Sequence, residues 1–239
     1  MERFFAKIRD HQVCLSPMDE HHLVNVMRAK VGTMIENVDA GDLYLAEVVS
    51  LSPLRIEIRQ ELSRPTELNA HLILGFSLLK GGHDELVLMK GTELGAFAFV
   101  PFLSERSIIR LDSKEREKRL QRFQKIVEGA ANQSKRMSIP KITPILDYQS
   151  VLSYPADHRY LAYENLSGDV FNLPKELSSI KAGESALFLI GPEGGFSPKE
   201  AALAEDAGFS FVSLGKRILR AETASIFVAS SFAFAEENK

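Results

Sequence analysis

Two short glycine-bearing stretches near the C-terminus decide how this chain folds. The first reads Gly-Pro-Glu-Gly-Gly-Phe (residues 191–196), and the second reads Leu-Gly-Lys-Arg-Ile-Leu-Arg-Ala-Glu-Thr-Ala (residues 214–224). Each directly follows an apolar run, at residues 187–190 and 211–214, and Ser197-Pro198 opens a helix-like stretch between them. Loops at the C-terminal ends of adjacent strands are where α/β proteins bind small ligands, so we expect a binding site here.

The chain from about residue 71 onward alternates between strand and helix patterns. Strands are predicted at residues 71–76, 96–102 and 159–163, and helices at residues 84–94, ended by Gly95, and after the capping residue Asp112. The long second helix carries an apolar stripe at Leu120, Phe123, Val127 and Ala130. This alternation predicts an α/β domain whose mostly parallel sheet has helices on both faces.

The first 70 residues are patterned differently and read as strand-rich. Apolar and charged residues alternate strictly at residues 54–59, and residues 42–49 are a second strand candidate. One helix is expected after Ser16, with Pro17 in its first position and an apolar stripe of Leu23, Val26 and Met27. These features predict a small β-barrel or barrel-like sheet, joined to the second domain by a linker at residues 63–66.

The composition is that of an ordinary globular protein. Of 239 residues, 45% are hydrophobic and 26% charged, and the net charge of −3 argues against wholesale attraction to nucleic acid. The single cysteine, Cys14, suits a reducing compartment, and we expect a cytoplasmic protein with no signal peptide and no membrane span. No histidine or cysteine spacing indicates a metal site, and no Gly-x-Ser-x-Gly indicates a hydrolase.

The first loop lacks the known nucleotide fingerprints. Neither Gly-x-Gly-x-x-Gly nor Gly-x-x-x-x-Gly-Lys-Ser/Thr is present. Glu193 would repel a pyrophosphate but tolerate a cation, so a ligand with an adenine and a positive sulfonium fits better than a nucleoside triphosphate. The alternative is a tight strand-to-helix turn, and the second loop of the same kind is what favours a binding site.

The charged residues suggest two further roles. The second loop carries Arg217, Arg220 and Glu222, and the alternative to a binding role is a solvated turn with an internal salt bridge. We single out Arg220, because a guanidinium grips planar oxygen-bearing groups. Six of the residues from Lys114 to Lys125 are basic, which indicates either a solvated helix face or contact with a phosphate backbone.

At the level of motifs, the chain resembles the RsmE family of SPOUT methyltransferases, which methylate N3 of a uridine in 16S ribosomal RNA. The two C-terminal loops carry the most specific part of this resemblance, and it extends nearly end to end. The other matching segments are residues 3–5, 21–24, 26–28, 31–32, 90–95 and 133–134. Asn25 stands where the family usually has arginine, and Gly91 replaces an alanine inside a helix, at a cost of about 1 kcal/mol.

The resemblance implies an α/β protein with a PUA-like β-barrel RNA-binding domain (residues 1–68) and a SPOUT domain (residues 71–239) with a parallel sheet and deep trefoil knot. It also implies a homodimer that binds S-adenosyl-L-methionine and acts on 16S ribosomal RNA in the small ribosomal subunit. The implied cofactor contacts are Leu189, Ile190, Gly191, Glu193, Gly194, Gly195, Leu214, Gly215, Ile218, Leu219, Arg220, Thr223 and Ala224. The residues expected to contact RNA are His22, Arg28, Lys30, Arg119, Arg122, Lys135 and Arg136.

For catalysis, the candidates are Arg220, Glu222 and Glu193. Arg220 is expected either to stabilise the uracil anion or to grip the target nucleotide, and either glutamate could accept the proton or orient the arginine. Two other functions stay open: methylation of another RNA such as a transfer RNA, and a non-catalytic role as an RNA-binding assembly factor. A nicotinamide-dependent oxidoreductase would need a fingerprint that the chain lacks.

Overall fold

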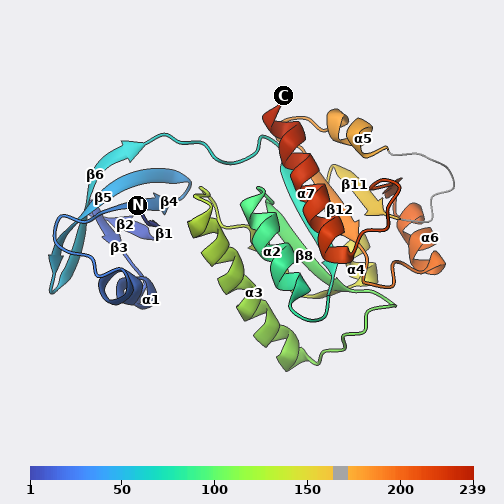
Figure 1. Cartoon of the computed structure of the whole chain (residues 1–239), viewed down its shortest axis with the longest axis horizontal. Coiled ribbons are helices and arrows are strands. Elements are labelled where there is room, and N and C mark those ends of the chain that lie inside the picture. Colours follow the sequence, from blue (N-terminus) through green and yellow to red (C-terminus); the bar gives the residue numbers. More distant parts are fainter. Residues whose placement is uncertain (164–171) are drawn as a thin grey trace. The chain divides into compact units, whose positions relative to one another are not determined.

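The computed structural model describes residues 1–163 and 172–239 and divides the chain into two compact units. The first unit comprises Met1–Glu67 together with Ala131–Ser138, and the second comprises Leu68–Ala130 together with Ile139–Lys239 (Figure 1). The last residues of the long helix α3 therefore belong with the N-terminal unit. Nowhere in the described ranges is there a helix long and apolar enough to cross a membrane.

The first unit is built on a six-stranded mixed sheet in the order β1-β4-β5-β6-β3-β2. Its strands are β1 (Arg3–Phe5), β2 (Lys7–Arg9), β3 (Gln12–Cys14), β4 (Met34–Asp39), β5 (Asp42–Leu51) and β6 (Leu54–Leu62). β1 runs parallel to β4, and the other pairings are antiparallel. The alternating pattern of β6 buries Ile56 in a core with Phe4 and Ile35, which confirms the strands predicted there.

The short helical segment of this unit begins as predicted but continues differently. Ser16 caps α1 (Pro17–His21) by accepting a hydrogen bond from the Asp19 backbone N–H at 3.2 Å. A π-helical turn, η1 (His22–Val26), follows directly. Leu23 is buried, but Val26 is 61% exposed, so the expected three-residue apolar stripe is wrong. The wider π turn rotates the later side chains away from the face on which Leu23 packs.

The second unit contains a seven-stranded sheet whose recorded pairings are all parallel. Its strands are β7 (His71–Ser77), β8 (Ala98–Leu103), β9 (Lys141–Ile142), β10 (Leu146–Asp147), β11 (His158–Ala162), β12 (Ser185–Ile190) and β13 (Ser210–Val212). The order is β10-β8-β7-β12-β11-β13, and β9 also pairs with β8. The predicted parallel α/β sheet is therefore confirmed.

Helices cover this sheet over two separate buried clusters, one on each face. They are α2 (His83–Glu93), α3 (Ser113–Gln133), α4 (Tyr148–Leu152), α5 (Leu173–Ser179), α6 (Pro198–Asp206) and α7 (Ala221–Glu237) (Figure 1). The predicted cap of α3 is confirmed, because Asp112 accepts from the Glu115 backbone N–H at 2.8 Å. Gly95 ends α2 with φ +88°, a conformation that favours glycine.

The position of β11 corrects one expectation. β12 and β13 lead into the two glycine-bearing loops, but they are not adjacent, because β11 lies between them and pairs with both. The order of strands in a sheet depends on how long connections cross over it, and the local pattern around the two loops does not contain that information.

Gly91 is also better suited to its place than its helix propensity suggests. A Cβ atom added there would lie 2.7 Å from Cε1 of Phe99 and 3.0 Å from Cδ1 of Leu74. The expectation of a simple 1 kcal/mol cost relative to alanine is therefore wrong, because the sheet packs against this glycine too closely for a larger residue.

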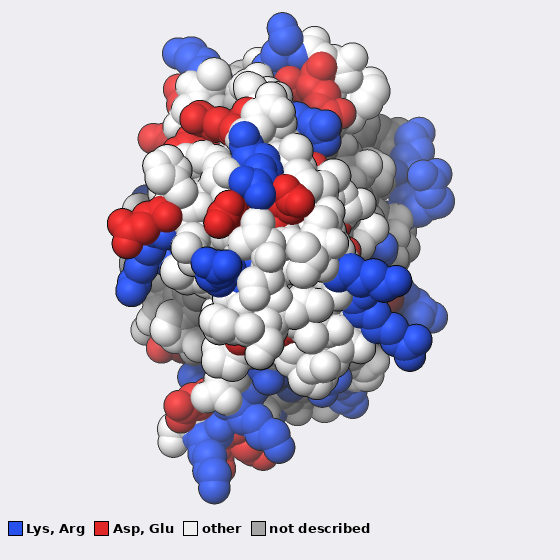
Figure 2. Space-filling view, turned by 90° about the vertical axis from the view of Figure 1, so that its left-hand side faces the viewer, with Lys and Arg blue, Asp and Glu red and all other residues white. Residues whose placement is uncertain are grey.

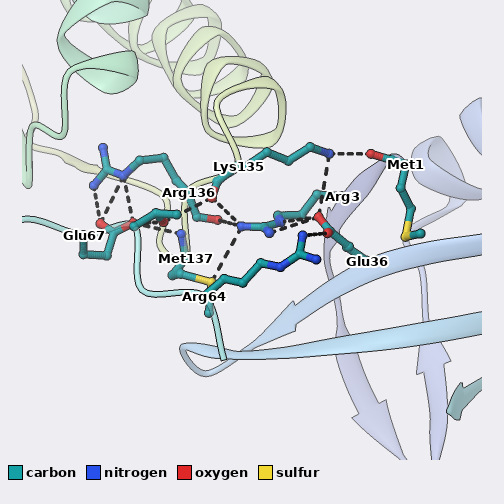
Figure 3. A network of polar contacts seen from close by, with 9 residues as sticks. Met1, Arg3, Glu36, Arg64, Glu67, Lys135, Arg136 and Met137 are labelled. Atoms are coloured by element: carbon teal, nitrogen blue, oxygen red, sulfur yellow. Dashed lines mark hydrogen bonds and ion pairs between the residues drawn. The ribbon is translucent and has the colours of Figure 1, made fainter. Parts of the chain in front are cut away.

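Buried charges hold residues 131–138 within the first unit (Figure 3). The Arg3 guanidinium contacts the Glu36 carboxylate at 3.0 Å, and it also donates to the backbone carbonyls of Lys135 and Arg136. Glu67 accepts hydrogen bonds from Arg136 Nε at 2.9 Å and from the Met137 backbone N–H at 2.8 Å (Figure 3). Hydrogen bonds to their own backbone atoms thus help to hold residues 131–138 in the first unit.

Candidate functional site

A cavity of about 580 Å³ lies at the C-terminal ends of β11, β12 and β13 in the second unit. Its wall is formed by Lys80, Gly81, His83, Ala162, Tyr163, Ile190, Gly191, Pro192, Glu193, Gly195, Phe196, Val212, Ser213, Leu214, Gly215, Lys216, Arg217, Ile218, Leu219, Arg220, Ala221, Glu222 and Ala224. Both glycine-bearing loops therefore meet at one hollow, together with the N-terminal end of α2. The volume lies within the range of small-molecule sites.

The glycines of the two loops allow the main chain to form this wall. Gly195 has φ +64° and Gly215 has φ +108°, where a side chain would strain the backbone. A Cβ atom on Gly191 would lie 3.1 Å from the Phe196 ring. The loops consequently present peptide groups to the cavity, as a main-chain binding site requires.

A buried carboxylate supports the first glycine-bearing loop. Glu200 in α6 accepts hydrogen bonds from the Ser104 hydroxyl at 2.8 Å, the Glu105 backbone N–H at 2.9 Å and the Ser197 backbone N–H at 2.9 Å. With the return bond from the Glu200 backbone N–H to the Ser197 hydroxyl, this forms a capping box. Arg106 adds a bond to the Gly194 carbonyl at 2.9 Å. Because one buried group joins the end of β8 to the start of α6, the loop has a rigid support.

Charged side chains of opposite sign line the cavity. Glu193 is exposed and accepts a hydrogen bond from the Lys80 backbone N–H at 3.2 Å. Glu222 is buried in the first turn of α7, and its Oε1 lies 3.3 Å from Nδ1 of His83. Arg220 is exposed at the N-cap of α7, although its side chain forms no capping hydrogen bond. The cavity therefore offers both a cation and a sheltered carboxylate to a ligand.

The structure brings most of the predicted cofactor residues to this wall. Those that line the cavity are Ile190, Gly191, Glu193, Gly195, Leu214, Gly215, Ile218, Leu219, Arg220 and Ala224. Leu189, Gly194 and Thr223 do not line it. Leu189 alternates with Ile190 and packs in the core on the opposite face of the sheet, whereas Gly194 and Thr223 are exposed outside the cavity.

Sequence reasoning missed the parts of the wall that lie outside the two loops, among them Lys80, His83 and Tyr163. Lys80 lies in the turn after β7, His83 is the first residue of α2, and Tyr163 follows β11. The glycine pair at residues 81–82 was a signal for a loop at the C-terminal end of a strand. Its position beside the two later loops depends on β7 pairing with β12, which only the fold reveals.

The residues of the cavity suit S-adenosylmethionine. Ile190, Val212 and Ala224 offer apolar surface for an adenine ring, and the glycine loops offer peptide groups for its polar edge. Glu193 and Glu222 are the carboxylates that favour a positively charged sulfonium. The volume, the apolar wall and the charge thus agree with the cofactor that the sequence suggested.

Exposed cations in the predicted RNA-contact set lie in both units. In the first unit, Arg28 and Lys30 are exposed, and His22 is half exposed, 3.9 Å from Glu2. Arg122 on α3 is 68% exposed although it pairs with Glu85. Figure 2 shows that on the face drawn the basic side chains are interspersed with acidic and neutral ones. Contact with phosphate would therefore be local, as the net charge suggests.

Two arginines in that set have their charge satisfied inside the protein, which corrects the expectation for them. Arg136 is 3% exposed and paired with Glu67. Arg119 donates to Asp84 at 3.1 Å and to the Leu79 carbonyl at 3.0 Å, and it lies over the Phe123 ring. Burial raises the pKa of Asp84, and the pairing with Arg119 opposes that rise. Lys135 is partly exposed, although its Nζ donates to the Met1 carbonyl at 2.6 Å and lies 3.8 Å from Glu36.

In residues 1–163 and 172–239, no three histidine, cysteine, aspartate or glutamate side chains gather in an arrangement that could hold a metal ion.

Comparison with known proteins places this geometry in a family. Residues 66–233 match the family described as RNA methyltransferase domain. Ribosomal RNA small subunit methyltransferase E of Bacillus subtilis (strain 168) is 34% identical, covering 99% of this chain and 98% of its own length. The protein of the same name from Synechocystis sp. is 32% identical over 91% of this chain and 71% of its own length.

A solved structure extends the agreement to three dimensions. The crystal structure of a Ribosomal RNA small subunit methyltransferase E from Neisseria gonorrhoeae bound to S-adenosyl methionine is 32% identical, with a TM-score of 0.84. The match covers 97% of this chain and 96% of that one, so it includes both units. The cavity between the two glycine-bearing loops agrees with these matches. The chain belongs to the RsmE family of RNA methyltransferases.

Proposed function

We propose that this protein transfers a methyl group from S-adenosylmethionine to N3 of a uridine in 16S ribosomal RNA of the small ribosomal subunit. The observation that carries the proposal is the cavity at the C-terminal edge of the parallel sheet, where both glycine-bearing loops, Arg220 and Glu222 meet. The names of the relatives support the ribosomal substrate, and the cofactor bound to the Neisseria gonorrhoeae protein supports the methyl donor.

The side chains at the cavity suit this reaction. When bound, S-adenosylmethionine supplies a methyl group attached to a sulfonium, which an incoming nucleophile can displace. Uracil N3–H is a weak acid, so the protein has to help remove its proton. The fixed positive charge of Arg220 at the cavity edge would stabilise the negative charge that develops on the uracil oxygens. The glycine loops, with Leu219 and Ile218 beside them, would hold the donor in place.

The proposal includes three finer structural features. The first unit serves as a PUA-like β-barrel RNA-binding domain, and the second carries a deep trefoil knot. Support for the knot comes from β13 at the sheet edge and from α7, which returns across β12 and β7 to pack against α2. The protein acts as a homodimer in the cytoplasm. Ile218 and Phe234, which are 85% and 70% exposed, support the dimer because they offer apolar surface to a second copy. Sedimentation velocity would detect that dimer.

RNA contact is assigned to the exposed and partly exposed members of the predicted set. These are His22, Arg28, Lys30, Arg122 and Lys135. Their charges would bind phosphates of the ribosomal RNA, which position the substrate without specifying its sequence. The target base would leave its stack to reach the cavity.

The test is to delete the gene and examine ribosomal RNA by mass spectrometry, then to supply purified protein with S-adenosylmethionine. We expect 3-methyluridine to disappear from 16S RNA and to return when purified small subunits are treated. Methylation of bulk transfer RNA instead would favour the alternative substrate. Binding of small subunits without methyl transfer and without S-adenosylmethionine binding in calorimetry would favour a non-catalytic assembly factor.

A further inference from the structure

The contact between His83 and Glu222 is the feature of the cavity that the proposed function leaves unused. His83 is the first residue of α2, and Glu222 lies in the first turn of α7. Their side chains are 41% and 11% exposed, and Nδ1 of His83 lies 3.3 Å from Oε1 of Glu222. Both residues line the same cavity as Arg220. A sheltered carboxylate therefore faces one nitrogen of a more accessible imidazole.

This arrangement determines which imidazole nitrogen can accept a proton. A carboxylate beside Nδ1 favours the tautomer that carries its hydrogen on Nδ1, and the lone pair is then on Nε2. A carboxylate that orients a histidine in this way is a recurrent arrangement for general-base catalysis. Histidine is also the side chain best suited to take up a proton near neutral pH.

The other groups at the cavity are less suited to that task. Glu193 is exposed and already accepts a hydrogen bond from the Lys80 backbone N–H. Arg220 keeps its charge at all physiological pH values. A free carboxylate is ordinarily too weak a base for an imide N–H at neutral pH. His83 is the one histidine that lines the cavity in the described part of the chain.

We propose that His83 accepts the N3 proton of the target uridine and that Glu222 is the positioning residue that orients its imidazole. The inference rests on the proposed methyl transfer. The uracil N3–H bond breaks, and the proton forms a bond with Nε2 of neutral His83. The electron pair left on N3 forms the new N–CH₃ bond, and the pair of the S–CH₃ bond stays on sulfur. The imidazolium then returns its proton to solvent.

Charged groups face His83 from two helices and a turn. Glu222 faces it from α7, and Lys80 precedes it in the turn after β7. On α2, Asp84 and Glu85 follow it, but their carboxylates pair with Arg119 and Arg122. Since neutral imidazole is the active form, we expect kcat to rise as pH increases until His83 is deprotonated, and then to level off.

The experiment compares three variants in single-turnover methylation of small subunits. His83→Gln should lower the rate about 100-fold or more and remove the rise with pH. His83→Lys keeps a cation beside Glu222 but stays protonated near neutral pH, so it should be equally slow. His71→Gln is the matched control, because His71 stacks on Phe97 at the start of β7 and does not line the cavity. Calorimetry should give an S-adenosylmethionine affinity that is unchanged in His71→Gln and within about three-fold of wild type in His83→Gln.

Two kinetic results would overturn the proposal. If His83→Lys is as active as the wild type, the pair is a structural charge contact, and His83 does not accept the proton. If His83→Gln keeps its rate and its rise with pH, another group is the base.

A second measurement needs neither cofactor nor RNA, so it separates this proposal from the proposed function. Nitrogen-15 NMR of the imidazole in the full chain should show hydrogen on Nδ1 of His83 at pH 8, and Glu222→Gln should weaken that preference. Hydrogen on Nε2 would contradict the arrangement. Wild-type protein that keeps the Nδ1 tautomer but methylates no ribosomal RNA would disprove the proposed function and leave the pairing intact.

Discussion

Arg3 and Glu36 form an ion pair with nitrogen–oxygen distances of 3.0 Å, and their side chains are only 1% and 6% exposed. Arg3 uses its remaining donors on the carbonyls of Lys135 and Arg136 (Figure 3). A single buried guanidinium therefore joins β1, β4 and the segment that follows α3 within the first unit. Buried pairs of this kind are costly to break, because the partner left behind is an uncompensated charge.

Replacing Arg3 by alanine should lower the free energy of unfolding by about 3–5 kcal/mol. The carboxylate of Glu36 would keep Arg64 and Lys135 as ion-pair partners, and the carbonyls of Lys135 and Arg136 would lose their hydrogen bonds from Arg3. Urea unfolding would measure the loss, and hydrogen exchange should show faster exchange in that segment. Arg55→Ala, an exposed cation on β6, is the control and should change stability by less than about 0.5 kcal/mol. Equal effects of the two variants would contradict the assignment.

Replacing Glu67 by glutamine should have an effect that depends on pH. Burial alone would raise the pKa of Glu67, but hydrogen bonds and the charge of Arg136 outweigh it and lower that pKa. A carboxyl with a lowered folded-state pKa stabilises the fold above its unfolded pKa, and this contribution is lost as pH falls through the folded value. We expect Glu67→Gln to cost about 1–2 kcal/mol at pH 7, with a difference that shrinks below about pH 4.5. Unfolding of both proteins at several pH values would test this. An equal difference in unfolding free energy between wild type and Glu67→Gln at every pH would contradict it.

Two helix glycines should respond in opposite directions to alanine. Gly91 in α2 has no room for a Cβ against Phe99, so Gly91→Ala should destabilise by about 1–3 kcal/mol. Gly129 in α3 is exposed with nothing within 4 Å of an added Cβ, so Gly129→Ala should stabilise by about 0.5–1 kcal/mol. Thermal unfolding of both would decide the question. Changes of the same sign would show that helix propensity, and not packing, governs the first site.

Replacing Arg220 by alanine should lower methyl transfer about 100-fold and leave S-adenosylmethionine affinity within about three-fold. The reason is that its guanidinium is proposed to act on charge that develops during the reaction. Single-turnover kinetics and calorimetry would separate the two effects. Arg217→Ala removes an exposed cation from the same loop and is the matched comparison. A rate within a few-fold of wild type in Arg220→Ala would exclude this role.

RNA affinity should fall with salt, and the exposed cations should account for part of the slope. Arg28→Ala and Lys30→Ala should each reduce the slope of log K against log salt by about 0.7. Arg136→Ala should instead destabilise the fold, because its charge is buried against Glu67. Filter binding with small-subunit RNA at several salt concentrations would measure these slopes. Slopes unchanged in the first two variants would place the contacts elsewhere.

The local elements could largely be predicted from the sequence, since their causes lie in neighbouring residues. Ser16, Asp112 and Ser197 each begin a helix as their side chains suggest, and Gly95 ends one. The final helix has no such capping signal, because its N-cap is Arg220, whose side chain forms no capping hydrogen bond. Caps depend on a few hydrogen bonds within one turn, so errors there stay small.

The candidate site was predictable only in part. Its two glycine-bearing loops stand out because glycine is needed where the backbone adopts positive φ, as at Gly195 and Gly215. His83 did not stand out, because a lone histidine at a helix start has no distinctive pattern. Its contact with Glu222 arises because α2 and α7 pack side by side, and the residues that meet are far apart in the chain.

The sequence by itself determined the alternation of strands and helices along the chain, the parallel pairing in the second unit and the two loops that mark the family. Tertiary structure alone decided that β11 separates β12 from β13, that Arg119 and Arg136 are satisfied internally, and that His83 meets Glu222. The physical reason is the distance along the chain over which each interaction acts. Propensity, capping and turn geometry act between near neighbours, whereas the partner of a buried charge is whichever distant segment the packing of the core brings to it.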